Sequence, residues 1–302
     1  MGITKLAHLI HFDAPASMCN REIGDLSGKI IALDTSIVVN QFRSAVPSHL
    51  KLSPLTGLFY RTLAFLENDI KPVFVLDGRP PNQKMALLEK RAQVTGWNSS
   101  QSTNSTTGLK HDYCRLLWLM GVPCINAPGE AEALCAHLVK TGRVNAVASE
   151  DMDTLAFGGT FLLRQLNAKK DSEITEYSLP KLLESLQLTY KETHPIPPNW
   201  QYEDARKLFF ETPKIDEPVF AWCEPDEDGL VQFLCKEKTL KEERIRGRMR
   251  KFRESRLKKR KQREENEKKG KTRQSRLEDF FPATRKRKSA DVKEMIGGKQ
   301  KK

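Results

Sequence analysis

The sequence lacks the features that would place a chain of 302 residues in a membrane or an oxidising compartment. No apolar run approaches the roughly 20 residues that a membrane helix needs, and the start, MGITKLAHLI, lacks the apolar core of a signal peptide. We therefore expect neither a membrane span nor secretion. The six cysteines form no CxxC pair and no cluster with histidine at zinc-binding spacing, which argues against the common zinc modules and favours reduced thiols inside a cell.

Basic charge is scarce in most of the chain and concentrated at its end. Residues 236–302 hold 28 Lys and Arg against 11 Asp and Glu, a net charge of +17, whereas residues 1–235 have a net charge of −5. A basic tail on an acidic body is typical of a protein with a polyanionic partner, most often nucleic acid. A tail that only solubilises or targets the chain is the alternative.

The first 190 residues contain a regular alternation of short β-rich runs and helical patterns. Strands are expected at 29–33, 72–76, 122–125, 144–148 and 160–164. Helices are expected at 55–67, 83–93, 109–120 and 130–140. The Ser-, Thr- and Asn-rich stretch 98–108 is expected to be a flexible loop. Strands that alternate with helices predict an α/β fold in which helices flank a parallel central sheet.

Acidic residues follow the expected strands in a pattern that is unusual for strand ends. Asp34, Asp77 and the stretch SEDMD at 149–153 each come directly after an apolar strand, and Glu130 and Glu132 open an expected helix. Because ligands of parallel sheets gather at the carboxyl ends of the strands, these side chains are predicted to share one edge. Each acid taken alone fits a helix cap or a solvated strand end. Six converging carboxylates do not fit that explanation.

Electrostatic repulsion indicates what would hold such acids together. Two carboxylates about 4 Å apart, at an effective dielectric constant near 20, repel each other by about 4 kcal/mol. Several such pairs require protons or cations to compensate. Carboxylates without histidine or cysteine suit Mg²⁺ or Mn²⁺ rather than zinc. Two such ions roughly 4 Å apart can hold the attacking and leaving oxygens of a phosphodiester, so the acids predict a metal site for phosphodiester hydrolysis.

Long motifs around these acids point to one family. They are ALDTS (32–36), FYRTLAFLENDIKPVFVLDGRPP (59–81), LMGVPCINAPGEAEALCAHLVK (119–140), ASEDMDTLAFG (148–158), PNWQYEDARKLFF (198–210) and EERIRGRMRK (242–251). The chain resembles the eukaryotic flap endonucleases, structure-specific 5′ nucleases of DNA replication and repair. The resemblance implies a 5′-nuclease (PIN-like) α/β fold. It also implies a 5′ flap endonuclease and 5′–3′ exonuclease that acts in Okazaki fragment maturation and base excision repair.

The resemblance assigns roles to single residues. It implies that two Mg²⁺ ions per chain, or Mn²⁺ in their place, are bound by Asp34, Asp77, Glu130, Glu132, Asp151 and Asp153. Glu150 would then be a neighbour of this set and not a ligand. Lys84 and Arg91 match catalytic basic residues that offset charge at the scissile phosphate. DNA contacts are implied for Arg61, Gly2 and Glu130.

The tail carries a second, independent motif. Four residues of QSRLEDFF have the spacing Q-x-x-aliphatic-x-x-aromatic-aromatic, namely Gln274, Leu277, Phe280 and Phe281. A short 3₁₀ turn would present their apolar side chains as one plug, and the motif resembles those that bind the trimeric replication sliding clamp. Basic runs at 258–261 and 285–288 indicate nuclear import or phosphate binding. We expect a monomer in the nucleus, with the mitochondrion as an alternative location.

The chain is expected to have three parts. An α/β nuclease domain would span 1–190, with a shortened helical arch at about 82–116. A truncated remainder of the nuclease core would span 191–235, and a disordered or helical basic tail 236–302. The arch is expected to be short because a polar stretch stands at its crown, where the family has charged helix.

The sequence also departs from the family that it resembles. Between Leu188 and His194 it lacks a helical segment that holds a seventh metal-site aspartate and a helix–hairpin–helix element for duplex DNA. Asn40 stands where the family has an aromatic residue that stacks on a base, a contact normally worth about 1–3 kcal/mol. Pro47 replaces a DNA-contacting arginine.

These departures leave three interpretations open. The first is a Mg²⁺-dependent 5′ flap nuclease of weakened activity that relies on the sliding clamp to stay near its substrate. The second is a non-catalytic paralogue that binds the clamp and DNA and keeps its acids as a relic. The third is that the gap comes from a transcript or gene model, so that one face of the sheet lies exposed. The six remaining acids favour the enzyme.

Overall fold

The computed structural model describes residues 5–36, 38–39, 42, 54–79, 99–166, 173–189 and 218–268. The chain divides into two compact units, residues 1–255 and 256–302. Within the described ranges, no helix combines the length and the apolar character that crossing a membrane would require.

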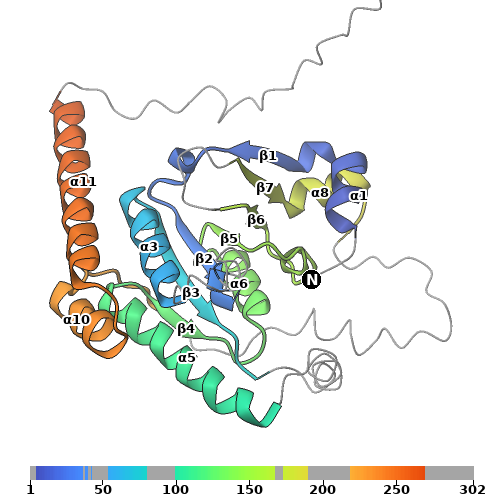
Figure 1. Cartoon of the computed structure of the whole chain (residues 1–302). Coiled ribbons are helices and arrows are strands. Elements are labelled where there is room, and N and C mark those ends of the chain that lie inside the picture. Colours follow the sequence, from blue (N-terminus) through green and yellow to red (C-terminus); the bar gives the residue numbers. More distant parts are fainter. Residues whose placement is uncertain are drawn as a thin grey trace, which may run out of the picture. The chain divides into compact units, whose positions relative to one another are not determined.

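A seven-stranded mixed sheet forms the centre of the first unit (Figure 1). Its strands are β1 (Met18–Arg21), β2 (Ile30–Asp34), β3 (Lys71–Leu76), β4 (Cys124–Asn126), β5 (Ala146–Ala148), β6 (Phe161–Arg164) and β7 (Ile174–Ser178). In the order β1-β7-β6-β5-β2-β3-β4, the five strands from β6 to β4 run parallel, and β7 and β1 are antiparallel to their neighbours. The α/β class is confirmed, and the parallel strands are the five that the sequence predicts.

Strands β1 and β7 are the part of the sheet that the sequence does not predict. Their sequences, MCNR and ITEYS, are short and largely polar, and Arg21 of β1 forms an ion pair of 3.0 Å with Glu176 of β7. Such a pair lies on a strand face that water reaches. A strand exposed on one face needs no continuous apolar run, so its sequence signal is weak.

Helices cover both faces of the sheet (Figure 1). They are α1 (Leu6–Asp13), α3 (Pro54–Glu67), α5 (Ser99–Leu119), α6 (Ala131–Lys140), α7 (Asp153–Ala156), α8 (Leu179–Leu186), α10 (Glu227–Val231) and α11 (Glu242–Lys268). Helices α3 and α5 share a core with Ile31 and Leu33 of β2. Helix α6 packs on the opposite face, against Ala32 and Val73. Burial on both faces explains why the central strands read as continuous apolar runs.

Helix α5 is longer than the sequence predicts. The polar stretch 98–108 was expected to be a flexible loop, but the helix begins at Ser99 and continues to Leu119, so this expectation is wrong. Its second half is anchored by Leu116 and Leu117, which are fully buried in the core. Extending an existing helix adds one hydrogen bond for each residue that becomes ordered, so residues of modest helix propensity can join it.

An extended segment, residues 218–226, fastens the C-terminal helices to the sheet. The Trp222 indole Nε1 donates to the Pro72 carbonyl at 2.9 Å, and the Cys223 amide donates to the Gly121 carbonyl at 2.9 Å. Gly121 has φ +66°, and a Cβ there would lie 2.2 Å from the Cys223 carbonyl oxygen. Only glycine permits this turn to approach so closely.

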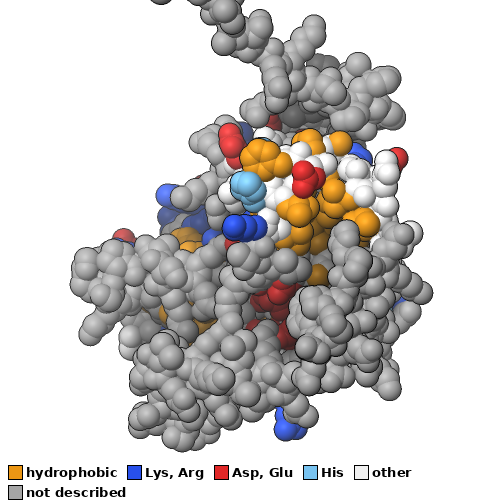
Figure 2. All heavy atoms as spheres, turned by 90° about the vertical axis from the view of Figure 1, so that its right-hand side faces the viewer, with side chains coloured by type: hydrophobic (Ala, Val, Ile, Leu, Met, Phe, Trp, Pro, Cys, Tyr) orange, Lys and Arg blue, Asp and Glu red, His pale blue; other side chains and the backbone are white. Residues whose placement is uncertain are grey.

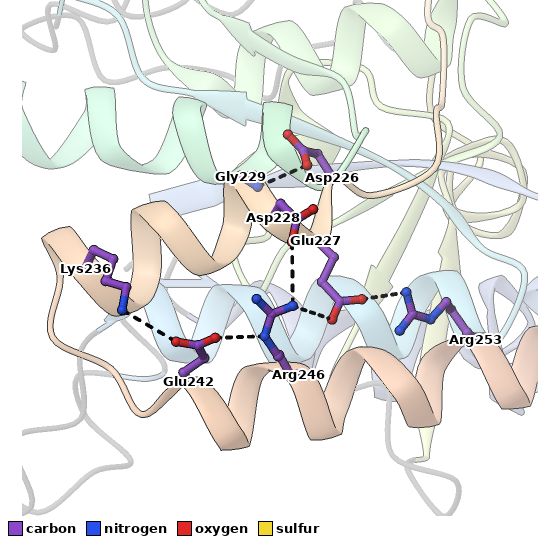
Figure 3. Close-up of polar contacts among 8 residues, drawn as sticks. All are labelled: Asp226, Glu227, Asp228, Gly229, Lys236, Glu242, Arg246 and Arg253. Carbon is purple, nitrogen blue, oxygen red and sulfur yellow. Dashed lines mark hydrogen bonds and ion pairs between the residues drawn. The ribbon is translucent and has the colours of Figure 1, made fainter.

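Helix α11 joins the core through its N-terminal half, which lies in the first unit. Ile245, Met249 and Phe252, spaced three to four residues apart, are buried. Arg248 forms a bidentate ion pair with Glu67 of α3. Further ion pairs link α11 to α10 and to the π-helical segment Gln232–Glu237 (Figure 3). The tail was expected to be disordered or helical, and residues 242–268 are helical.

Candidate functional site

Two aspartates stand at the carboxyl ends of adjacent parallel strands. Asp34 is the last residue of β2 and is 2% exposed, and Asp77 directly follows β3. The register of the two strands places Asp34 opposite Val75. Ser36 connects the two carboxylates, because its amide donates to Asp34 Oδ1 at 2.8 Å and its hydroxyl donates to Asp77 Oδ2. The two acids are therefore held side by side by one residue.

The first turn of α6 brings two glutamates to the same edge. Glu130 immediately precedes α6 and Glu132 lies in its first turn. The Ala131 amide donates to Asp77 Oδ1 at 2.9 Å, so the helix N-terminus contacts the aspartate directly. The loops beside the two acids also touch, because the Gly78 amide donates to the Gly129 carbonyl at 2.6 Å. A Cβ on Gly78 would lie 2.0 Å from a backbone oxygen, which requires glycine there.

The third pair of acids follows β5. The Ser149 hydroxyl accepts from the Asp151 amide at 3.0 Å, and Asp151 Oδ1 accepts from the Asp153 amide at 3.1 Å. Glu150 contacts β6 instead, where its carboxylate accepts from the Gln165 amide at 2.9 Å. We call the six predicted metal ligands together the acidic edge: Asp34, Asp77, Glu130, Glu132, Asp151 and Asp153.

The pKa of Cys135, a fully buried residue of α6, responds to the charges of the acidic edge. Burial raises the pKa of its thiol well above the usual value, and the charges of Asp34, Glu132 and Asp77 raise this pKa further. One thiol is thus within electrostatic range of carboxylates from β2, from α6 and from the end of β3. The sequence does not single out Cys135, although its place three residues after Glu132 puts both on one side of the helix.

The chemistry of the acidic edge fits a hard divalent cation. Within the described residues, no three His, Cys, Asp or Glu side chains lie close enough to hold one ion. Hydrogen bonds join Asp34, Asp77 and the start of α6 in one group, and Asp151 and Asp153 in another. The carboxylates of Asp77 and Asp151 accept hydrogen bonds from neutral donors, namely a serine hydroxyl and two backbone amides. Carboxylate oxygens of this kind are the ligands that Mg²⁺ and Mn²⁺ prefer. Figure 2 shows acidic side chains, in red, on one face of the molecule.

Arg61 of α3 is one of two predicted DNA-contacting residues that the structure describes, and Glu130 is the other. Its guanidinium lies 4.7 Å from the centre of the Phe42 ring, a cation–π geometry that fixes the side chain. Burial lowers the pKa of Arg61, while the charge of Glu150 acts in the opposite direction. Arg61 is therefore within electrostatic range of the residue that precedes Asp151.

Several predicted site residues lie outside the described residues. They are Gly2, Lys84, Arg91, Gln274, Leu277, Phe280 and Phe281. The same holds for Asn40, Pro47 and the expected helix at 83–93. Their roles stay predictions.

Two serines at the acidic edge were not identified from the sequence. Ser36 joins the carboxylates of two strands, and Ser149 holds the backbone of Asp151. Each stands two residues from an acid, in DTS and SED respectively. Small polar residues just after a strand are common in turns, so this spacing alone gave no reason to choose them.

The fold of the chain is that of the 5′-nuclease proteins. The structure of human GEN1 in complex with Holliday junction DNA superposes with a TM-score of 0.68 over 83% of this chain and 77% of that chain, at 18% sequence identity. At that identity the likeness establishes the fold. The family models for the XPG N-terminal domain and the XPG I-region match residues 1–96 and 121–195.

Curated relatives identify the family within this class. A probable flap endonuclease 1 homolog from Danio rerio is 70% identical over 346 aligned positions, covering 99% of each chain. Flap endonuclease 1 from the same species is 36% identical over 381 positions, covering 100% of this chain and 97% of that protein. The chain belongs to the flap endonuclease family.

The same alignments reveal residues that this chain does not have. The chain has 302 residues, so at least 44 of the 346 positions aligned with the homolog have no counterpart in it. The alignment with flap endonuclease 1 has at least 79 such positions. The shortening therefore distinguishes this chain even from a relative that is 70% identical.

Proposed function

We propose that this nuclease is a structure-specific 5′ flap endonuclease and 5′–3′ exonuclease that hydrolyses phosphodiesters with two Mg²⁺ ions. The observation that supports the proposal is the position of the acidic edge: its residues follow the carboxyl ends of β2, β3 and β5 or stand at the start of α6. Membership of the flap endonuclease family and the likeness to a nuclease bound to branched DNA support it.

Each part of the acidic edge has a place in this proposal. The six carboxylates would hold the ions, which when bound would polarise the phosphate and lower the pKa of an attacking water. Ser36 would keep the carboxylates of Asp34 and Asp77 oriented, since it hydrogen-bonds both. Ser149 would hold the turn that carries Asp151. Arg61 would contact a DNA phosphate near the same edge.

The biological setting is proposed from the sequence motifs. The clamp-binding motif that ends in Phe280 and Phe281, together with the basic runs of the tail, supports action in the nucleus on Okazaki fragments and in base excision repair. Binding to the trimeric sliding clamp would raise the local concentration of the nuclease at a flap. This matters because the family's duplex-binding element is absent from the sequence between Leu188 and His194. We propose that the shortening weakens DNA binding more than it weakens the chemical step.

The test is cleavage of 5′-flap DNA across a Mg²⁺ titration, with and without the sliding clamp. The matched control is Asp151→Ala, which removes one carboxylate from the acidic edge. We expect cleavage by the unaltered chain, at least about 100-fold above the control, because loss of a metal ligand removes several kcal/mol of transition-state stabilisation. Cleavage no greater than that of Asp151→Ala, even with clamp, contradicts the proposal.

Metal uptake provides a second measurement. Isothermal titration should detect Mg²⁺ or Mn²⁺ binding that is lost in Asp34→Ala. A chain that takes up neither ion would be a non-catalytic clamp- and DNA-binding protein. Neither the described residues nor the relatives of the chain favour that alternative.

A further inference from the structure

Two cysteines that the proposed nuclease chemistry does not use lie against each other. Cys114 Sγ of α5 and Cys124 Sγ at the start of β4 are 3.5 Å apart. Both are free thiols, and each is partly exposed. A disulfide requires a sulfur–sulfur distance of about 2.05 Å, so an approach of about 1.5 Å by two flexible side chains is sufficient.

We propose that Cys114 and Cys124 form a redox-sensitive modification site that a peroxide converts reversibly into a disulfide. One thiolate attacks the peroxide, an S–O bond forms as the O–O bond breaks, and hydroxide leaves and becomes water by taking up the proton that the thiol released. The second thiolate then attacks the sulfenic sulfur, the S–S bond forms, and hydroxide leaves. In total, two thiols and one hydrogen peroxide give one disulfide and two waters, and a dithiol reductant reverses the change.

The environment of the pair gives the two thiols different roles. Burial, the neighbouring Cys114 and the hydrogen bond between the two sulfurs raise the pKa of Cys124. Cys124 is therefore the poorer nucleophile toward the peroxide, so Cys114 takes the role of the thiol that is oxidised first, and Cys124 loses its proton only when it attacks the neighbouring sulfenic sulfur. Of the other four cysteines, Cys19 and Cys223 are exposed, Cys235 is partly exposed and Cys135 is buried.

The position of the pair connects it to the acidic edge. Lys110 lies one helical turn before Cys114 on α5, and its Nζ donates to the Asp77 carbonyl at 2.7 Å. Strand β4, which Cys124 begins, leads within six residues to Glu130. A disulfide would tie together the two elements that flank Asp77. It would also close a short loop, since the cysteines are ten positions apart, and so raise the midpoint of thermal unfolding.

Thiol counting on the full chain tests the proposal. After reduction, removal of the reductant and exposure to hydrogen peroxide, the wild type should lose two of its six thiols and recover them with dithiothreitol. At the same peroxide dose, Cys114→Ser should keep all five remaining thiols, and Cys124→Ser should lose at most one, as a sulfenic acid at Cys114 that has no thiol to resolve it. The control Cys223→Ser, which removes an exposed thiol outside the pair, should still lose two.

Peptide mapping under non-reducing conditions identifies the bond. Trypsin with a glutamate-specific protease separates Cys114, Cys124 and Cys135 onto different peptides, because cleavage follows Arg115 and Glu130. A Cys114–Cys124 peptide that accounts for the lost thiols supports the proposal. Retention of all six thiols, or linkage through other cysteines, overturns it. The thiol count of the wild type and the peptide map both use unaltered protein, so neither depends on the folding of a variant or on nuclease activity.

Discussion

The acidic edge and the α10–α11 region both gather carboxylates, but their partners differ. At the α10–α11 region, Glu227 contacts Arg246 at 3.4 Å and Arg253 at 2.6 Å, and Glu242 contacts Arg246 at 2.8 Å (Figure 3). At the acidic edge, the described partners of the Asp77 carboxylate are a serine hydroxyl and a backbone amide.

Under the proposed function, the comparison distinguishes acids that stabilise the fold from acids that would bind a cation. An arginine that pairs with a carboxylate neutralises its charge within the protein. Such a carboxylate needs no further cation once the chain has folded. Neutral donors orient a carboxylate and leave its negative charge in place. Two such carboxylates about 4 Å apart would repel each other by about 4 kcal/mol, and under the proposed function a bound ion would relieve that repulsion. The acidic edge should therefore respond to metal, and the α10–α11 region should respond to loss of an arginine contact.

The largest expected effect comes from neutralising one acid at the acidic edge. Asp77→Asn keeps an acceptor for the Ala131 amide and a polar partner for Ser36. We expect flap cleavage to fall by about 100-fold or more, while the free energy of unfolding without metal is unchanged or higher because one repelling charge is gone. Added Mg²⁺ should raise the unfolding midpoint of the wild type and not that of the variant.

The matched control for this experiment is Glu150→Gln. Glu150 is in the same acidic stretch, but its carboxylate contacts the Gln165 amide and lies 3.7 Å from Arg164. Its cleavage rate should stay within about tenfold of the wild type, a free-energy difference below about 1.4 kcal/mol. Equal losses in the two variants would mean that the acidic edge has no special role.

The sequence predicted the parts of the fold that depend on apolar runs. Strands such as β2 and β3 are buried on both faces, so their residues are continuously apolar and easily identified. Strands β1 and β7 lie at the far side of the sheet, where polar residues suffice, and they gave no such signal. The start of α5 was missed because Ser, Thr and Asn favour loops in isolation, and only attachment to an anchored helix overrides that preference.

The candidate site was predictable to a similar extent. The position of Asp34 and Asp77 directly after apolar strands was enough to predict them as site residues, because the carboxyl ends of parallel strands lie at one edge of the sheet. Ser36 and Cys135 could not be chosen, since their importance lies in contacts between distant segments. The role of Arg61 came from family resemblance, and no charge pattern in the sequence would have suggested it.

A smaller effect is expected at the α10–α11 region. Glu227→Gln removes the charge that Arg246 and Arg253 share, and the glutamate side chain is 16% exposed while both arginines are more open to water. We expect a loss of about 1–2 kcal/mol in the free energy of unfolding, measured in urea, because two partly buried ion pairs lose their attraction. Specific cleavage activity should not change.

Glu254→Gln is the control for that measurement, because it removes an exposed carboxylate from α11. Its effect on unfolding should stay below about 0.5 kcal/mol. A Glu227 variant as stable as the Glu254 variant would show that the ion pairs of Figure 3 do not hold α11 in place.

The smallest expected effect concerns pH and an exposed ion pair. Arg115 lowers the pKa of Glu237 below its ordinary value of 4.5 through two hydrogen bonds of 2.6 and 2.8 Å. A carboxylate whose pKa is lowered by folding stabilises the native state above its unfolded pKa, and this contribution disappears as pH falls through the lowered value. Urea unfolding of the wild type and of Glu237→Gln should differ slightly at pH 7 and converge as the pH falls below 4.5. High salt should remove the difference at pH 7, because water reaches both side chains. A difference that persists in acid would mean that Glu237 contributes through packing and not through its charge.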